Sequence, residues 1–199
     1  MFVVIATVLA ACAPAMAAGA PTGRPADENL TVSDTYMVSG TESWRDINIK
    51  ASGTLLVPPG ATLNARSISL QGGSFQVNGG TVAVTQPLPG QDATLSGTCS
   101  EFNLTNGATI KLVAPSAGTA IESSQGGAAI VQVDASGSII VTGGSRIQCT
   151  GGSGFGPGAP WTTGALGGYV SAGGRGLISL GGPATPYVEV SGGAQLVTT

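Results

Sequence analysis

The 199-residue sequence contains no histidine, and only 9% of its residues are charged. Histidine is the most frequent general base and a common metal ligand, so its absence removes both roles at once. Seven Lys and Arg stand against ten Asp and Glu, giving a net charge of −3. A chain without a basic run lacks the electrostatic footprint of a nucleic-acid-binding protein. We therefore expect no nucleic-acid partner.

Aromatic residues are also scarce, at 5% of the chain, whereas Gly occurs 33 times and Pro 12 times. This composition excludes a bundle of long helices, because Gly and Pro are the poorest helix formers. It also excludes a large core built on aromatic rings. What is present is Val, Ile, Leu and Ala, which suit thin layers of β-structure.

The amino terminus is typical of an export signal. Met1 to Ala20 contains no charged side chain, Phe2 to Leu9 is an apolar run, and Ala15-Met16-Ala17 fits the pattern cleaved by signal peptidase. The basic residues that normally precede such a run are missing. We predict a signal peptide over residues 1–17, a flexible leader over 18–29, and a secreted or cell-surface location.

A second interpretation of the same segment is lipidation. Leu9-Ala10-Ala11-Cys12 resembles the lipobox of bacterial lipoproteins, in which the cysteine carries the lipid. The chain would then contact a membrane through Cys12. Otherwise we expect no membrane association, since the apolar stretch is broken by Pro14 and is shorter than the roughly 20 residues of a spanning helix.

From Leu30 onward the sequence consists of short stretches in which apolar and polar residues alternate, which is the signature of β-strands. Gly-Gly, Pro-Gly, Asn-Gly and Ser-Gly pairs separate these stretches and indicate turns. The predicted strands contain Leu30–Val32, Ile47–Ile49, Leu55–Val57, Ile68–Leu70, Phe75–Val77, Val82–Val84, Ile110–Leu112, Ile130–Val133, Ile139–Val141, Val188–Val190 and Leu196–Val197.

One phrase recurs along the chain: an apolar residue, two polar or turn residues, Gly, a small residue, a polar residue and an apolar residue. It appears in Val57–Leu63, Leu104–Ile110 and Val190–Leu196, with looser copies in Val77–Val82 and Val133–Ile139. Its central glycines are Gly60, Gly80, Gly107, Gly137 and Gly193. A repeat of about 20 to 30 residues is typical of a solenoid, in which each coil buries its apolar side chains against its neighbours.

We therefore predict an all-β fold, a right-handed parallel β-helix (β-solenoid) over residues 30–199. Residues 30–46 are the expected N-terminal cap, because an open solenoid end is an unpaired sheet edge. Residues 142–186 are the expected Gly-rich excursion. The alternative is a β-sandwich or jelly roll, which also has short strands and frequent turns.

The short strands, the Val-x-x-Gly-Ala-x-Leu phrases and the later Gly-rich excursion resemble secreted right-handed parallel β-helix repeat proteins of the pectin-lyase-like superfold. The resemblance covers roughly residues 45–199. It rests on the general pattern of short strands and Gly-rich turns, without a diagnostic motif. It implies a large surface or adhesin-like protein, and it carries no functional residue over to this chain.

The candidate ligand contacts are few. Glu42, Trp44 and Asp46 form the densest polar group, either as the cap or as a carbohydrate contact with the ring as platform. Trp161 and Tyr169 lie in the excursion, either pinning a loop or stacking on sugars. Pectin-degrading enzymes of this fold use clustered Asp, which the sequence does not show. We expect no catalytic, cofactor-binding or metal-binding residues, although whether the chain is an enzyme stays open.

Two modifications and one pairing are also considered. Asn29-Leu30-Thr31 and Asn103-Leu104-Thr105 are glycosylation sequons. Cys99 and Cys149 would pair in an oxidising compartment. Coils of about 25 residues would place them two coils apart, however, beyond the roughly 7 Å between Cα atoms that a disulfide permits. Both states stay open.

The function expected from these features is non-enzymatic: a structural or adhesive extracellular protein, or a fragment of a larger repeat protein. The expected partners are glycans, other surface proteins, or a second copy bound through an open solenoid end. The alternative is a carbohydrate-binding module or a polysaccharide-degrading enzyme on a β-helix.

Overall fold

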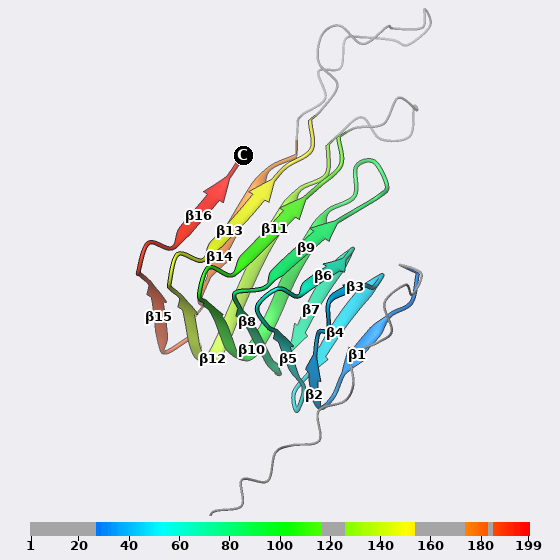
Figure 1. The fold of residues 1–199 in the computed structure, drawn as a ribbon. Coiled ribbons are helices and arrows are strands. Elements are labelled where there is room, and N and C mark those ends of the chain that lie inside the picture. Colours follow the sequence, from blue (N-terminus) through cyan, green and yellow to red (C-terminus); the bar gives the residue numbers. More distant parts are fainter. Residues whose placement is uncertain (1–26, 117–125, 154–173, 183–184) are drawn as a thin grey trace, which may run out of the picture.

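The computed structural model describes residues 27–116, 126–153, 174–182 and 185–199. Within these ranges every regular element is a β-strand, labelled β1 to β16 in Figure 1. No helix in the described part of the chain has the length and apolarity needed to cross a lipid bilayer. The predicted signal peptide, Cys12 and most of the leader lie outside the described residues.

The strands form three faces, and one strand from each face makes up a coil. The first face contains β1 (Leu30–Val32), β4 (Asp46–Lys50), β7 (Ser67–Gln71), the first part of β10 (Ala93–Thr105), the first part of β12 (Ala129–Val141) and β14 (Gly176–Leu180). The second face contains β2 (Thr35–Met37), β5 (Thr54–Val57), β8 (Ser74–Asn78), the second parts of β10 and β12, and β15 (Tyr187–Val190). The third face contains β3 (Thr41–Ser43), β6 (Thr62–Ala65), β9 (Thr81–Thr85), β11 (Thr109–Val113), β13 (Arg146–Thr150) and β16 (Gln195–Thr198).

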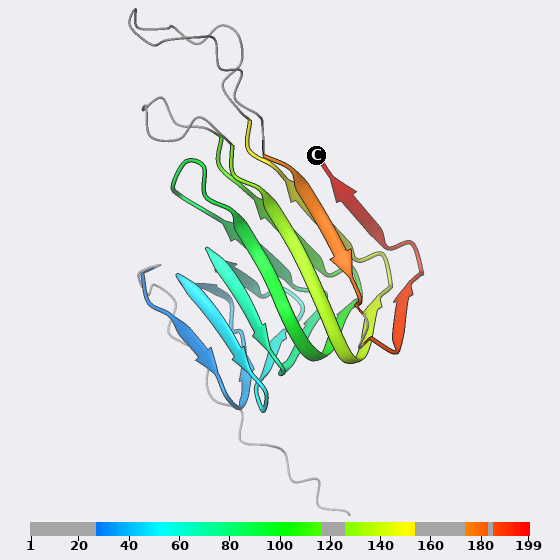
Figure 2. The same ribbon diagram turned by 180° about the vertical axis from the view of Figure 1, so that it is seen from behind.

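All pairings between these strands are parallel and join strands of successive coils. The two long strands turn the corner between the first and second faces: β10 pairs with β7 through Thr94–Thr98 and with β8 through Glu101–Thr105. The first two faces therefore belong to one sheet and the third face to another. Figures 1 and 2 show the coils stacked along one axis.

The core consists of columns of apolar side chains that run along this axis. Alternate residues of each strand point inward, as the alternating burial of β4 to β9 shows. On the second face, for example, Phe75 pairs in register with Phe102, and their rings stack with centroids 5.4 Å apart. Each coil thus covers the apolar residues of the next, which is how a solenoid obtains a core.

The prediction of an all-β fold with parallel strands is confirmed for the described residues, and the arrangement is consistent with a parallel β-solenoid. The alternative, a β-sandwich, does not fit, because sandwiches pack antiparallel sheets.

The recurring Gly phrase marks the corner between the second and third faces. Gly60, Gly80, Gly107 and Gly193 lie in this corner, as the phrase predicts. The copy assigned to Gly137 is wrong: this residue lies within β12, one residue before Ser138, which pairs with Glu101 at the start of the second face. The true fourth copy is Val141–Ile147, with Gly143 and Gly144 at positive φ.

From the second to the fifth coil the coils become longer, and nearly all of the extra residues enter at one corner, between the third and first faces. The connections there are residues 44–45, 66, 86–92, 114–128 and 151–175. The coil length of about 25 residues that placed the two cysteines two coils apart therefore does not apply to these coils. Cys99 in β10 and Cys149 in β13 lie in successive coils rather than two coils apart, and on different strands.

Two predicted boundaries also change. Residues 30–43 are the strands β1 to β3 of the first coil, each paired with a strand of the second coil. The expected Gly-rich excursion over 142–186 includes strands β13 and β14, which belong to the sheets.

Candidate functional site

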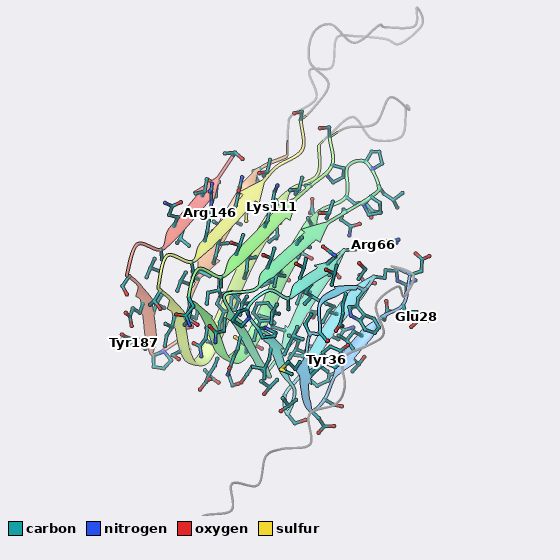
Figure 3. The ribbon with its side chains drawn as sticks, viewed as in Figure 1. Glu28, Tyr36, Arg66, Lys111, Arg146 and Tyr187 are labelled. Atoms are coloured by element: carbon teal, nitrogen blue, oxygen red, sulfur yellow. The ribbon has the colours of Figure 1, made fainter. Side chains whose placement is uncertain are left out.

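The outer surface of the third face carries an ordered set of polar side chains (Figure 3). In each copy of the Gly phrase, the residue after the last apolar position points outward, since its neighbours in the strand point inward. Register places Ser43 beside Asn64, Asn64 beside Ala83, and Ala83 beside Lys111. This column continues to Gln148.

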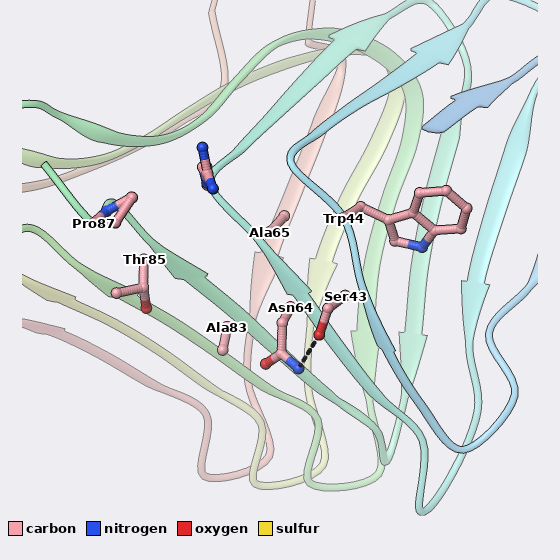
Figure 4. A pocket seen from close by; sticks show the side chains of 8 residues that line it. Ser43, Trp44, Asn64, Ala65, Ala83, Thr85 and Pro87 are labelled. Carbon is pink, nitrogen blue, oxygen red and sulfur yellow. Dashed lines mark hydrogen bonds between the residues drawn. The ribbon is translucent and has the colours of Figure 1, made fainter. Parts of the chain in front are cut away.

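A shallow depression lies where this column meets the corner with the longer connections (Figure 4). It has a volume of about 290 Å³. Its lining residues, which we call the third-face groove, are Ser43, Trp44, Asn64, Ala65, Arg66, Ala83, Thr85 and Pro87. Two of these residues come from the third coil: Ala83 lies in β9 and Pro87 in the connection that follows it.

The groove offers neutral hydrogen-bonding groups and one cation. The Asn64 amide donates from Nδ2 to Ser43 Oγ at 3.3 Å and to the Glu42 carbonyl oxygen at 3.4 Å, which fixes its orientation. Arg66 donates from Nη2 to Asp27 Oδ1 at 2.9 Å, and the Arg66 side chain remains 32% exposed. Hydroxyl, amide and guanidinium groups in this arrangement suit a polyol or a carboxylate.

Two of the predicted carbohydrate contacts are buried, each with 4% of its surface exposed: Trp44 and Glu42. Trp44 Nε1 donates to Glu42 Oε2 at 3.2 Å, and the indole ring points away from the groove in Figure 4. Neither side chain offers a platform or an acceptor at the surface. Asp46 is partly exposed and accepts hydrogen bonds from Ser67 Oγ at 2.7 Å and from Arg45 Nε at 3.2 Å.

The remaining predicted contacts divide into two groups. Trp161 and Tyr169 lie outside the described residues. Of the two sequon asparagines, Asn29 is exposed and its Oδ1 accepts from Arg45 Nε at 3.0 Å. Asn103 is partly buried on the outer side of β10, where Nδ2 donates to Glu101 Oε2 at 3.4 Å and Oδ1 has no hydrogen-bond partner.

Both cysteines of the predicted mature chain are free and buried. Burial raises the pKa of Cys99 to about 12, and the negative charges of Asp134 and Glu101 contribute to this rise. Burial likewise raises the pKa of Cys149 to about 11, against a smaller lowering by a backbone hydrogen bond at Val131. A thiol with a raised pKa stays protonated at neutral pH, so both behave as small apolar side chains.

The groove residues Asn64, Arg66 and Thr85 were not identified from the sequence. The repeat contained a signal for the first of them: extending the Gly phrase by one residue aligns Asn64, Ala83 and Lys111 in one column. Among the described residues, no group of three His, Cys, Asp or Glu side chains is placed to hold a metal ion.

Comparison with known proteins adds no relative. No protein-family model, no curated protein and no solved structure matches this chain.

Proposed function

We propose that this chain is a rigid structural module of an extracellular or cell-surface protein, which holds other surfaces apart or together through contacts along its faces. The observation that carries the proposal is the in-register stacking of six successive coils on continuous apolar columns. Hydrogen bonds between parallel strands run along the axis in every face, so the stack resists bending and stretching. The export signal predicted for residues 1–17 supports the location.

The outer surface supports the same proposal. The column Thr41, Thr62, Thr81 and Thr109 on the third face is in register, and its first charged member is Arg146 in the fifth coil. The column of Thr31, Asn48 and Ser69 on the first face is similar. Like charges on adjacent strands would repel one another, so neutral polar columns stabilise a long stack while keeping it hydrated.

We also propose that the solenoid is right-handed. Connections that return a chain to a parallel strand of the same sheet are right-handed in about 98% of cases, and each coil here makes such a return. An experimental structure of the chain tests this directly, and a left-handed coil would contradict it.

The location is tested by mass spectrometry of the mature protein from cells that produce it, combined with protease treatment of intact cells. We expect a mature amino terminus at Ala18, or a lipid on Cys12, and loss of the protein when the cells are treated. Recovery of Met1 in protein protected from the protease would exclude an extracellular role.

The third-face groove favours a second candidate function, the binding of a glycan. Its amide, hydroxyl and guanidinium groups match the hydroxyl groups of a sugar, and a uronic acid would pair with Arg66. Carbohydrate binding would then be one of the contacts that the rigid module makes.

A glycan array tests this candidate with the chain and two matched variants. Asn64→Ala removes an amide from the groove, whereas Asn48→Ala removes an outward amide from the first face. We expect binding to an acidic or neutral glycan that is weakened about tenfold or more by Asn64→Ala and unchanged by Asn48→Ala. Equal binding by both variants, or no binding by the parent chain, would rule the groove out as a glycan site.

A further inference from the structure

The charged side chains of the described strands are divided unequally among the three faces. Lys111 in β11 and Arg146 in β13 are the charged residues that point outward from the strands of the third face, and both are exposed. The acidic residue in the strands of this face, Glu42, points inward and is buried. The strands of the other two faces carry four acidic residues and one lysine: Asp46, Glu101, Asp134, Glu189 and Lys50. The third face is therefore cationic, although the chain has a net charge of −3.

Lys111 and Arg146, which we call the third-face cation pair, lie close together. Arg146 is in register with Thr109, and Lys111 follows Thr109 by two residues on the same strand. A strand spacing of about 4.8 Å and a rise of about 3.3 Å per residue place the Cα atoms of the pair about 8 Å apart. Figure 3 labels both residues on this face. Like charges this close repel each other, and an anion bound between them relieves the repulsion.

Neither cation is neutralised by an acidic residue within the described part of the chain. The ion pairs there are made by other arginines, Arg45 with Asp46 at 3.2 Å and Arg66 with Asp27 at 2.9 Å. The third-face cation pair is thus available to an external anion.

The surroundings of the pair are polar and uncharged, and they indicate the kind of anion. Thr109 lies beside Arg146, and Gln148 lies beside Lys111. Hydroxyl and amide groups hydrogen-bond to sugar hydroxyls, while Lys and Arg pair with carboxylate or sulfate groups. Two cations without a neighbouring aromatic ring are too few for a nucleic acid, which needs a basic stripe, or for an anionic membrane, which attracts clusters of about four to eight Lys and Arg. The combination fits an anionic polysaccharide.

We propose that the third face binds an anionic polysaccharide, with its charged groups on Lys111 and Arg146 and its hydroxyl groups on the neighbouring Thr and Gln side chains. The pair adjoins the third-face groove, since Ala83 of the groove lies in register with Lys111. The inference rests on the glycan-binding candidate for the class of ligand, but it depends on residues outside the groove. Salt weakens binding of this kind, because exposed charges are screened.

Surface plasmon resonance of the purified chain tests the proposal with three polymers of one backbone: dextran, carboxymethyl dextran and dextran sulfate. Lys111→Gln and Arg146→Gln each remove one cation, and glutamine already occupies the next position of both columns, at Gln148 and Gln195. Lys50→Gln is the matched control, since it removes the same charge from an exposed position on the first face.

We expect at least one of the two anionic dextrans to bind more tightly than dextran, and to bind less tightly as salt is added. Lys111→Gln and Arg146→Gln should each raise its dissociation constant about fivefold, the effect of one exposed charge contact. Lys50→Gln should leave the dissociation constant unchanged. The anionic dextran that binds more tightly identifies the group, carboxylate or sulfate, that the face prefers.

Equal weakening by Lys111→Gln and Lys50→Gln would overturn the proposal, because only the net charge would then matter. Equal binding of the three dextrans, or binding of none, would also overturn it, as would tighter binding to duplex DNA or to anionic lipid vesicles. The groove fails separately: if Asn64→Ala leaves binding unchanged while Lys111→Gln weakens it, the cation pair binds the polysaccharide without the groove. The opposite pattern would leave the groove as the glycan site and exclude the pair.

Discussion

Glu42 occupies a position that the repeat reserves for apolar residues. Its column continues through Leu63, Val82 and Ile110, yet its carboxylate is buried in the first coil. Tyr36 Oη donates to Oε2 at 2.6 Å, the Ser39 amide donates to Oε1 at 2.8 Å, and Trp44 Nε1 donates to Oε2. These donors compensate for the loss of water around the charge.

Replacing Glu42 with Leu would match the column but remove the acceptor of all three donors. We expect this substitution to lower the free energy of unfolding by about 1–3 kcal/mol, the usual cost of leaving buried polar groups unpaired. Urea denaturation measures it. Glu101→Leu serves as the control, since Glu101 is exposed and outward, and should change stability by less than about 0.5 kcal/mol. A more stable Glu42→Leu protein would show that the apolar column matters more than the hydrogen bonds.

The two buried cysteines predict an alkaline limit on stability. Their pKa values in the folded chain, about 12 for Cys99 and about 11 for Cys149, lie above the ordinary thiol value of 9.0. The unfolded chain therefore releases these protons first as the pH rises, so stability is retained below pH 9 and falls between pH 9 and the folded pKa values. Urea denaturation over the range from about pH 8 to about pH 11 measures this loss.

Cys149→Ala separates the thiol from other alkaline effects. The substitution removes one of the two titrating groups, so the variant should lose less stability than the parent chain between pH 9 and about pH 11. The smaller side chain can change the free energy of unfolding by the same amount at every pH, and such a change does not affect the slope of stability against pH. Identical slopes would mean that Cys149 does not carry the effect.

Among the secondary-structure elements, the sequence predicted the corners between strands, through the recurring Gly phrase, more reliably than the strands themselves. Four of the five glycines of the repeat lie in the predicted corner. Gly60, Gly107 and Gly193 have positive φ there, whereas beside Gly80 it is Gly79 that adopts positive φ. Gly137 was misassigned since its surroundings match the phrase, although it lies at a different corner. Composition cannot distinguish one corner of a coil from another.

Strand prediction relied on the alternation of apolar and polar residues and was incomplete, since it missed β6 and β13 although both alternate. β4, β7 and β8 follow the alternation and were predicted. β3 was missed because its single inward residue is Glu42, and β14, with the sequence Gly-Leu-Ile-Ser-Leu, was hidden in the Gly-rich stretch. The same reason explains the error at the site: periodicity gives no sign that an acidic residue lies inside.

Two glycines allow the cost of a side chain at positive φ to be measured separately from the cost of a steric clash with its Cβ atom. Gly107 has φ +75 and open space where a Cβ would lie, whereas Gly97 has φ +124 and its Cβ would meet the Leu70 carbonyl oxygen. Gly107→Ala should cost about 1–2 kcal/mol, the strain of a left-handed conformation. Gly97→Ala should cost clearly more, because a backbone oxygen must also move.

Urea denaturation of the two alanine variants compares these costs. Gly107→Asn supplies a control, since Asn tolerates positive φ and the neighbouring Asn106 already adopts φ 56. We expect it to be less destabilising than Gly107→Ala. Equal losses for Gly97→Ala and Gly107→Ala would mean that the strands around Gly97 move apart at little cost.

For the whole molecule, the repeat predicted stacking but not the difference between the two ends. Coil stacking follows from apolar columns that no single coil can bury, and the recurring phrase reveals this need. Whether an end is open depends on which side chains cover it. Trp44 and Glu42 were expected at the first coil for that purpose, but nothing in the repeat indicated that Val188 and Val190 would be exposed among the described residues.

This asymmetry predicts a gradient of local stability along the axis. In a stack where each coil contacts only its neighbours, local opening is easiest where contacts are one-sided. The inward side chains of β15 and β16 have a coil on one side only, while those of β8 and β11 lie between two coils. Amide hydrogen exchange should therefore be faster in β15 and β16 than in β8 and β11.

Hydrogen exchange followed by mass spectrometry of the purified chain measures this gradient. The first coil should exchange more slowly than the last, since its inward side chains are buried. Uniform exchange in all coils would mean that the stack opens as a single cooperative unit, and that the uncovered end does not weaken it.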